Sequence, residues 1–277
     1  MNGEVPGLRI RLPARPANVA VVRHAVAGLA EQLGMNEPSI GDLKTVVTEA
    51  CMNVVVHAYG DGDGPLEVEA FPEDDGLTVC VRDFGDGIRP RPDIERPSLR
   101  IGLTLIAALS SSFEIAGGLG RGTEVRMHLV LEPGVSTDGG PPPGVAPSVP
   151  IPDAAELTIG RPDLAAPVLE RVVGALASRH PITVDRLSDA VLLTDAVSAR
   201  APEAFGEGGM RFAVKDGDGG IDLRIGPMPE GASRELLDGL ALPQVGGTLE
   251  ALADEMRIEQ DDQGEYVVVR FAALAAD

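Results

Sequence analysis

The segment from Glu132 to Asp153 constrains the fold of this chain more than any other feature. Glycine and proline interrupt it too often for a helix or a strand, and its centre reads Gly-Gly-Pro-Pro-Pro-Gly at 139–144. Such a composition is typical of a semi-extended linker. We therefore expect two domains of similar size, residues 1–132 and residues 154–277, joined by a linker over residues 133–153.

The second domain repeats the sequence plan of the first. A shift of 146 positions (194 − 48 = 146) superimposes two blocks without a gap, and a glycine before the last expected strand recurs at a slightly smaller shift. The matching pairs are Val46–Ala50 with Leu192–Ala196, His57–Gly60 with Glu203–Gly206, and Gly122 with Gly264. Blocks that recur in the same order indicate an internal duplication.

The two copies differ at polar positions, while most of the apolar frame persists. The changes are Asn53 to Ala199, Glu49 to Asp195, and Asp-Phe-Gly-Asp-Gly at 83–87 to Ile-Gly-Pro-Met-Pro at 225–229. A copy that keeps fold-forming residues without these polar ones indicates that they are not needed for folding. We therefore expect a degenerate second domain that lacks the functional motifs.

Hydrophobic periodicity predicts the elements of the first domain. Alternating strands are expected at Leu8–Leu12, Leu66–Ala70, Leu77–Val81, Phe113–Ala116 and Thr123–Leu131, and helices at Ala17–Leu33, from Ser39 as N-cap to about Tyr59, and at Gly102–Leu109. Strands with segregated helices predict an α+β fold, a two-layer α/β sandwich that the second domain repeats in tandem.

The second of these helices carries a polar stripe beside an apolar one. Glu49, Asn53 and His57 are four residues apart and so lie on one helical face. The apolar positions follow the i, i+3, i+4 pattern of a buried face: Leu43, Val46, Val47, Ala50, Cys51, Val54 and Val55. A carboxylate and an amide at the edge of a core are suited to a magnesium–phosphate site.

A second polar feature follows the strand that ends at Arg82. Asp83 emerges on the apolar face of that strand, where a carboxylate is costly unless a donor such as the exocyclic amino group of a base meets it. Gly85 and Gly87 allow the backbone to approach a ligand closely. The alternative interpretation is an ordinary Asp-Gly turn.

Two further glycine motifs come later in the domain. Gly102 is expected at the start of a helix, where free N–H groups suit a phosphate. Gly120-Arg121-Gly122-Thr123 precedes the last strand and is also compatible with a plain turn.

The order of these motifs resembles the GHKL ATPase superfamily, which includes gyrase, Hsp90, histidine kinases and MutL. The phrase Glu-Ala-x-x-Asn-x-x-x-His-Ala-Tyr at 49–59 is most similar to the anti-sigma-factor serine/threonine kinases of bacteria. The resemblance covers residues 8–131. One departure is Arg-Ile-Gly at 100–102, where the family usually has a Gly-x-Gly pair.

The resemblance implies ATP and Mg²⁺ as cofactors, together with a role for each matched residue. At the phosphate end, Asn53 would ligate Mg²⁺, Glu49 would orient or deprotonate the attacking hydroxyl, and Gly102 would lie under the phosphates. At the base end, Asp83 would accept a hydrogen bond from the adenine amino group, and Thr123 would support it. Gly85 and Gly87 would line the base pocket.

The resemblance also implies partners. An anti-sigma kinase would phosphorylate a STAS-domain anti-sigma antagonist and bind a sigma factor. The alternative is a non-catalytic module that holds ATP and sequesters its partner. Because the family commonly forms homodimers, the second domain is a candidate for the place of the second subunit, in an intramolecular pseudo-dimer.

Composition excludes several other classes. A formal net charge of −20 disfavours direct binding to nucleic acid or anionic membranes. Cys51 and Cys80 have no metal-binding spacing and are expected to be buried thiols. With no apolar segment near Met1 and no run of membrane-spanning length, we expect a cytoplasmic protein.

Overall fold

The computed structural model describes residues 7–60, 62–87, 97–118, 120–130, 154–160, 164–179, 183–205, 209–217, 220–239 and 252–272. The chain divides into two compact units, Met1–Pro141 and Pro142–Asp277. The predicted linker, residues 133–153, lies outside the described residues.

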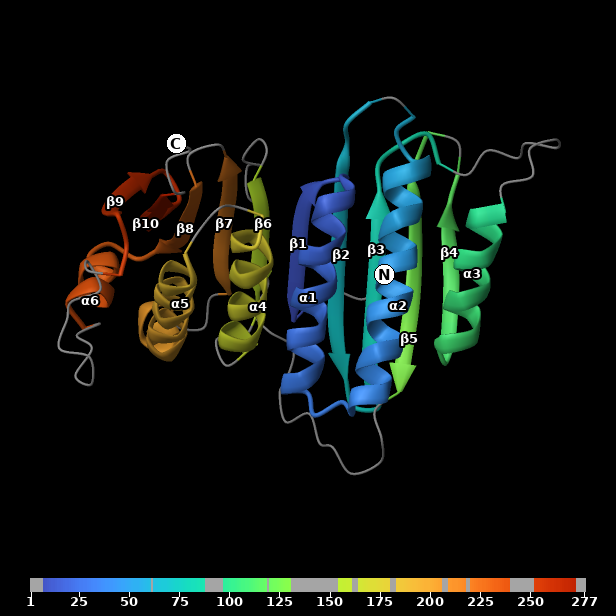
Figure 1. Ribbon diagram of the computed structural model, residues 1–277, viewed down its shortest axis with the longest axis horizontal. Coiled ribbons are helices and arrows are strands. Elements are labelled where there is room, and N and C mark those ends of the chain that lie inside the picture. The colour runs from blue at the N-terminus through green and yellow to red at the C-terminus, as the bar shows by residue number, and fades with distance from the viewer. Residues whose placement is uncertain are drawn as a thin grey trace. The chain divides into compact units, whose positions relative to one another are not determined.

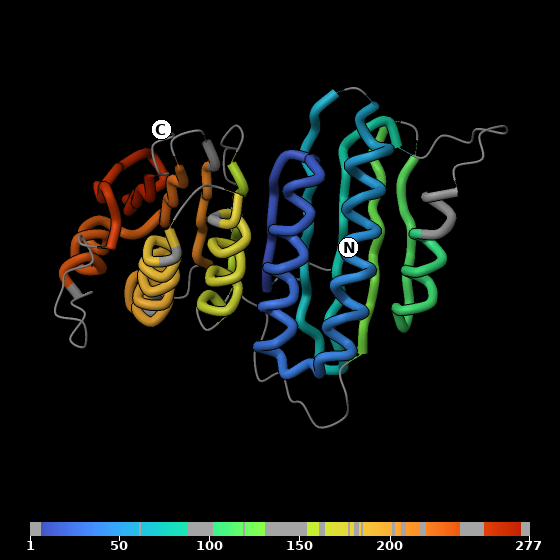
Figure 2. Tube along the Cα trace, in the orientation of Figure 1, coloured from blue at the N-terminus to red at the C-terminus, as the bar shows by residue number. Residues whose placement is uncertain are grey.

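The first unit is an α+β sandwich in which three helices cover one face of an antiparallel sheet (Figure 1). Its strands are adjacent in the order β4-β5-β3-β2-β1. The elements are β1 (Leu8–Pro13), α1 (Pro16–Gln32), α2 (Glu37–His57), β2 (Pro65–Glu73), β3 (Gly76–Asp83), α3 (Pro97–Leu109), β4 (Ser112–Gly117) and β5 (Thr123–Val130). Helices α1 and α2 run side by side along the sheet, and α3 lies beyond α2 (Figure 2).

The core of this unit lies between the helices and the sheet. Alternate residues of β1 are buried, as are the apolar residues predicted for α2 with the exception of Val55, which is half-buried. Cys51 and Cys80 are buried free thiols, as predicted, and burial raises their pKa values to about 12 and about 11.

Two predicted helix starts are wrong. Helix α2 begins at Glu37, because the side chain of Asn36, not Ser39, is the N-cap: Asn36 Oδ1 accepts a hydrogen bond of 2.8 Å from Ser39 N. Helix α3 begins at Pro97, since proline is tolerated in a first turn. Gly102 therefore lies inside α3 and offers no free helix-start N–H group.

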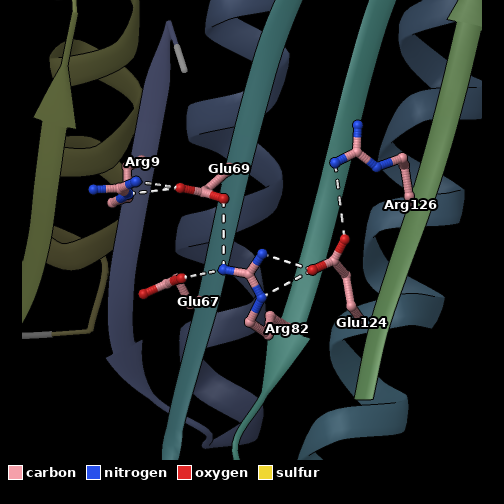
Figure 3. A network of polar contacts seen from close by, with 6 residues as sticks. All are labelled: Arg9, Glu67, Glu69, Arg82, Glu124 and Arg126. Carbon is pink, nitrogen blue, oxygen red and sulfur yellow. Dashed lines mark hydrogen bonds and ion pairs between the residues drawn. The ribbon is translucent and has the colours of Figure 1, made fainter. Parts of the chain in front are cut away.

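The sheet face opposite the helices carries a network of ion pairs across β1, β2, β3 and β5 (Figure 3). Arg82 is its centre: its guanidinium donates to Glu67 at 2.8 Å and to Glu124 at 3.0 Å, and lies 3.6 Å from Glu69. Arg9 donates to the other side of Glu69 at 2.7 Å. Opposite charges thus alternate on neighbouring strands, which stabilises this register.

The second unit has the same succession of elements and the same order of neighbouring strands, β6-β7-β8-β10-β9. Its elements are β6 (Ala154–Ile159), α4 (Ala165–Ala177), α5 (Val184–Phe205), β7 (Met210–Gly217), β8 (Gly220–Met228), α6 (Ala232–Gly239), β9 (Glu255–Asp261) and β10 (Gly264–Ala272). Among the described residues of both units, no helix combines the length and apolarity that a membrane span requires.

Candidate functional site

Helix α2 presents Glu49 and Asn53 to the backbone of α3 at Gly102. A Cβ atom at Gly102 would lie 2.7 Å from Glu49 Oε2 and 3.7 Å from both Oδ1 and Nδ2 of Asn53. A side chain at this position would displace the Glu49 carboxylate, so glycine allows α3 and this carboxylate to lie close together. The structure thus brings together the carboxylate, the amide and the glycine that the sequence singled out.

The amide of Asn53 is not satisfied by the protein. Its Nδ2 atom is buried and has no hydrogen-bond partner among the described residues. A buried polar atom without a partner is destabilising, and a ligand or an ion that completes it is one reason for a natural protein to retain it. The neighbouring amide oxygen and the Glu49 carboxylate are hard oxygen donors, so this donor set fits Mg²⁺ and the phosphates that accompany it.

Asp83 is the last residue of β3 and is only 4% exposed. Its Oδ1 atom accepts a hydrogen bond of 2.9 Å from Gly85 N, which closes a tight turn after the strand. The register of β3 with β5 pairs Arg82 with Glu124 near this end of the sheet. Asp83 ends β3 and Thr123 begins β5, so a buried carboxylate and a hydroxyl residue lie at the same end of the sheet.

Two glycines allow the loop after Asp83 to pack closely against the backbone of neighbouring segments. A Cβ atom at Gly85 would lie 2.1 Å from the carbonyl oxygen of Ala58, and one at Gly87 would lie 2.1 Å from that of Gly118. Gly87 also has a positive φ of 74°. In this structure Gly85 and Gly87 contact protein backbone, so close loop packing is one reason for glycine at both positions.

Gly120 and Gly122, just before β5, contact the same loop. Gly122 N donates to Gly85 O at 3.1 Å, and Gly120 N donates to Asp86 O at 3.0 Å. A Cβ atom at Gly122, which has a φ of 71°, would lie 2.1 Å from Asp83 O. The Gly-x-Gly-Thr motif therefore holds the Asp83 loop in place through backbone hydrogen bonds.

Tyr59 also contacts the loop that follows Asp83, a role that no sequence motif predicted. Its hydroxyl accepts a hydrogen bond of 2.8 Å from Phe84 N and donates one to Pro65 O. Burial is the main cause of its raised pKa. The signal in the sequence was its place at the end of the Glu-Ala-x-x-Asn-x-x-x-His-Ala-Tyr phrase.

One other group of ligating side chains lies elsewhere in the described part of the chain. Glu73, Asp75 and His128 place potential ligand atoms within 4.8 Å of one another. They surround the Gly76 end of β3, whereas Asp83 is the opposite end of the same strand. This group is therefore not part of the Glu49 and Asn53 site.

The second unit has a charged side chain at the position that matches Thr123 in the sequence. Since Gly264 matches Gly122, Glu265 takes the position of Thr123. One oxygen of Glu265 accepts from the hydroxyl of Ser233 at 2.8 Å and from its N–H at 3.3 Å, at the start of α6. The backbone of Gly231 and then the Ser233 hydroxyl lower the pKa of this carboxyl group.

Comparison with known proteins agrees with a GHKL-type ATPase domain. Residues 12–129 match the family model described as a histidine kinase-like ATPase domain. An anti-sigma F factor of Clostridium beijerinckii is 32% identical over 130 residues, which cover 43% of this chain and 90% of that protein. A serine-protein kinase RsbW of Bacillus velezensis is 39% identical over 87 residues, 31% of this chain, and the match spans about half (54%) of the kinase. The serine-protein kinase RsbW of Bacillus subtilis is 36% identical over the same length and share of each chain. This chain therefore belongs to the histidine kinase-like ATPase family, in its anti-sigma kinase group.

Proposed function

We propose that the first unit binds Mg-ATP and transfers the γ-phosphoryl group to a serine or threonine of a partner protein. The observation that carries this proposal is the convergence of Glu49, Asn53 and Gly102, with the Nδ2 atom of Asn53 buried and without a hydrogen-bond partner among the described residues. Intact Glu49 favours catalysis, because nucleotide binding alone depends more on Asn53 and Asp83 than on a basic carboxylate.

Each residue has a defined task in this proposal. The amide oxygen of Asn53 ligates the metal, and the Asp83 carboxylate accepts from the adenine amino group beside Thr123. When bound, Mg²⁺ supplies charge neutralisation at the phosphates. The Glu49 carboxylate orients the acceptor hydroxyl and takes its proton, so the main contributions of the protein are positioning and proton transfer.

The names of two relatives support the partners that we propose. The C. beijerinckii protein is named as an anti-sigma F factor and the B. velezensis protein as a serine-protein kinase. We propose that this chain likewise binds a sigma factor and phosphorylates a STAS-domain antagonist, in the cytoplasm. The net charge of −20 supports a protein partner over nucleic acid.

We propose that the second unit is a degenerate copy of the first. The repeated element order, the change of Asn53 to Ala199, and the Glu265 carboxylate bound at the start of α6 support a unit that has lost its nucleotide. If this unit replaces a second subunit, the chain sediments as a monomer. A tight homodimer at low concentration counts against that role.

A second candidate function is a binding module that holds ATP without transferring phosphate. Arg-Ile-Gly at 100–102 favours it, because the usual Gly-x-Gly pair is missing and Gly102 lies within α3 rather than at its start. A phosphotransfer assay separates the two candidates.

The assay combines the full chain, γ-labelled ATP and a STAS-domain substrate with Glu49→Ala as the test variant. We expect Glu49→Ala to bind ATP within about twofold of the parent and to lose at least about 100-fold in transfer, as for removal of a general base. Asp195→Ala changes the matching carboxylate of the second unit and should retain both properties. ATP binding without transfer by the parent protein leaves only the binding module, and no ATP binding refutes both candidates.

A further inference from the structure

The hydroxyl of Tyr59 joins three segments of the first unit. Tyr59 follows the end of α2, its partner Pro65 begins β2, and its other partner Phe84 follows β3. The same ring also occupies the space beside Gly64, where a Cβ atom would lie 2.2 Å from it. The helix that carries Glu49 and Asn53 is thus tied directly to the loop that carries Asp83.

This tie acts at the residue next to Asp83. Phe84 N donates to Tyr59, and the following amide, Gly85 N, donates to Asp83 Oδ1. The two successive N–H groups therefore fix the backbone and the carboxylate of one tight turn. Without the hydroxyl, Phe84 N loses this partner and the turn is free to shift.

The second unit separates the role of the ring from the role of the hydroxyl. Phe205 stands where Tyr59 stands in the first unit (59 + 146 = 205), and this residue is 8% exposed. The packing of an aromatic ring is thus kept, while the hydroxyl is absent together with the counterparts of Asn53 and Asp83. The fold tolerates phenylalanine here, which indicates that the hydroxyl serves the site.

We propose that Tyr59 is a positioning residue that sets base specificity, because its hydroxyl holds the Asp83 carboxylate where it receives the amino group of adenine. This inference rests on the proposed nucleotide function and deepens it. Inosine triphosphate carries a carbonyl oxygen in place of that amino group. A fixed carboxylate repels this oxygen, whereas a carboxylate on a loosened turn can move away from it.

The test compares Mg-ATP and Mg-ITP binding to the full chain by titration calorimetry. We expect the parent to prefer ATP, and Tyr59→Phe to weaken ATP binding about tenfold while ITP affinity changes less than about twofold. The matched control is Tyr266→Phe, which removes the hydroxyl of the other tyrosine, in the second unit, and should leave both affinities unchanged. A smaller preference for ATP over ITP in Tyr59→Phe than in the parent supports the inference. A general loss of structure would instead lower both affinities together.

Three outcomes overturn the inference: equal losses for ATP and ITP, no loss for either, or an altered preference in Tyr266→Phe. Failure of the parent to bind ATP refutes the proposed function first, and this inference with it. If Tyr59→Phe melts well below the parent, 3-fluorotyrosine is incorporated into the Tyr266→Phe chain, so that only residue 59 is labelled. The fluorinated hydroxyl accepts the hydrogen bond from Phe84 N more weakly, so the preference for ATP over ITP should fall, as in Tyr59→Phe. An unchanged preference counts against the proposal.

Discussion

Gly102 on α3 lies directly against the carboxylate of Glu49 on α2: a Cβ atom at Gly102 would lie 2.7 Å from Glu49 Oε2. The closeness of α3 to this carboxylate depends on the missing side chain. A side chain added at residue 102 would therefore displace the Glu49 carboxylate while Glu49 itself stays unchanged.

Substitution Gly102→Ala should leave the fold intact and reduce phosphotransfer at least about tenfold. Alanine favours a helix over glycine by about 1 kcal/mol, but here its Cβ displaces the Glu49 carboxylate. The control is Gly41→Ala on α2, where the added Cβ would meet no atom within 4 Å apart from its chain neighbours and the backbone of its own helix. Gly41→Ala should raise the unfolding free energy by about 0.5–1 kcal/mol with full activity. Equal transfer rates for Gly102→Ala and the parent would show that the position of Glu49 is not critical.

Substitution Asn53→Ala should abolish Mg-ATP binding with a change of less than about 1 kcal/mol in the free energy of unfolding. The amide Nδ2 is buried without a partner, so its loss breaks no hydrogen bond in the described protein. Calorimetry and thermal melting measure the two effects. Asn36→Ala provides the converse control: it removes the N-cap of α2 and should lower stability by about 1 kcal/mol without affecting ATP affinity.

Substitution Arg82→Gln should lower the free energy of unfolding by about 1–3 kcal/mol, because it leaves Glu67 without this donor and removes the centre of the network in Figure 3. Urea unfolding followed by circular dichroism measures the change. Arg257→Gln also removes two ion pairs, with Glu255 and Glu259, but from an exposed strand. Its effect should stay below about 1 kcal/mol, and equal effects of both variants would contradict a stabilising network.

The Glu265 carboxylate should make the stability of the second unit depend on pH. Its hydrogen bonds lower the pKa of the folded state below the ordinary value of 4.5, so its stabilising contribution is present above pH 4.5 and is lost as the pH falls through the lowered pKa. Glu265→Gln should be less stable than the parent at pH 7, and the two should converge in acid. Parallel stability curves from pH 7 to acid would refute this linkage.

Much of the first unit could be predicted from local patterns. The apolar spacing on α2 indicated its buried face, and alternation indicated β2 and β3, because both patterns report which residues face a core. The starts of α2 and α3 could not be predicted in this way. A helix start depends on which nearby side chain reaches a free N–H, and Asn36 and Ser39 were equally suitable by type.

The sequence by itself determined which chemical groups are present and on which elements: a carboxylate and an amide on one helical face, and an aspartate after a strand. Only the tertiary structure decided that Gly102 meets Glu49 and Asn53, and that the hydroxyl of Tyr59 meets Phe84. Both contacts join residues at least 25 positions apart, and they depend on helix packing and strand register that no local pattern encodes.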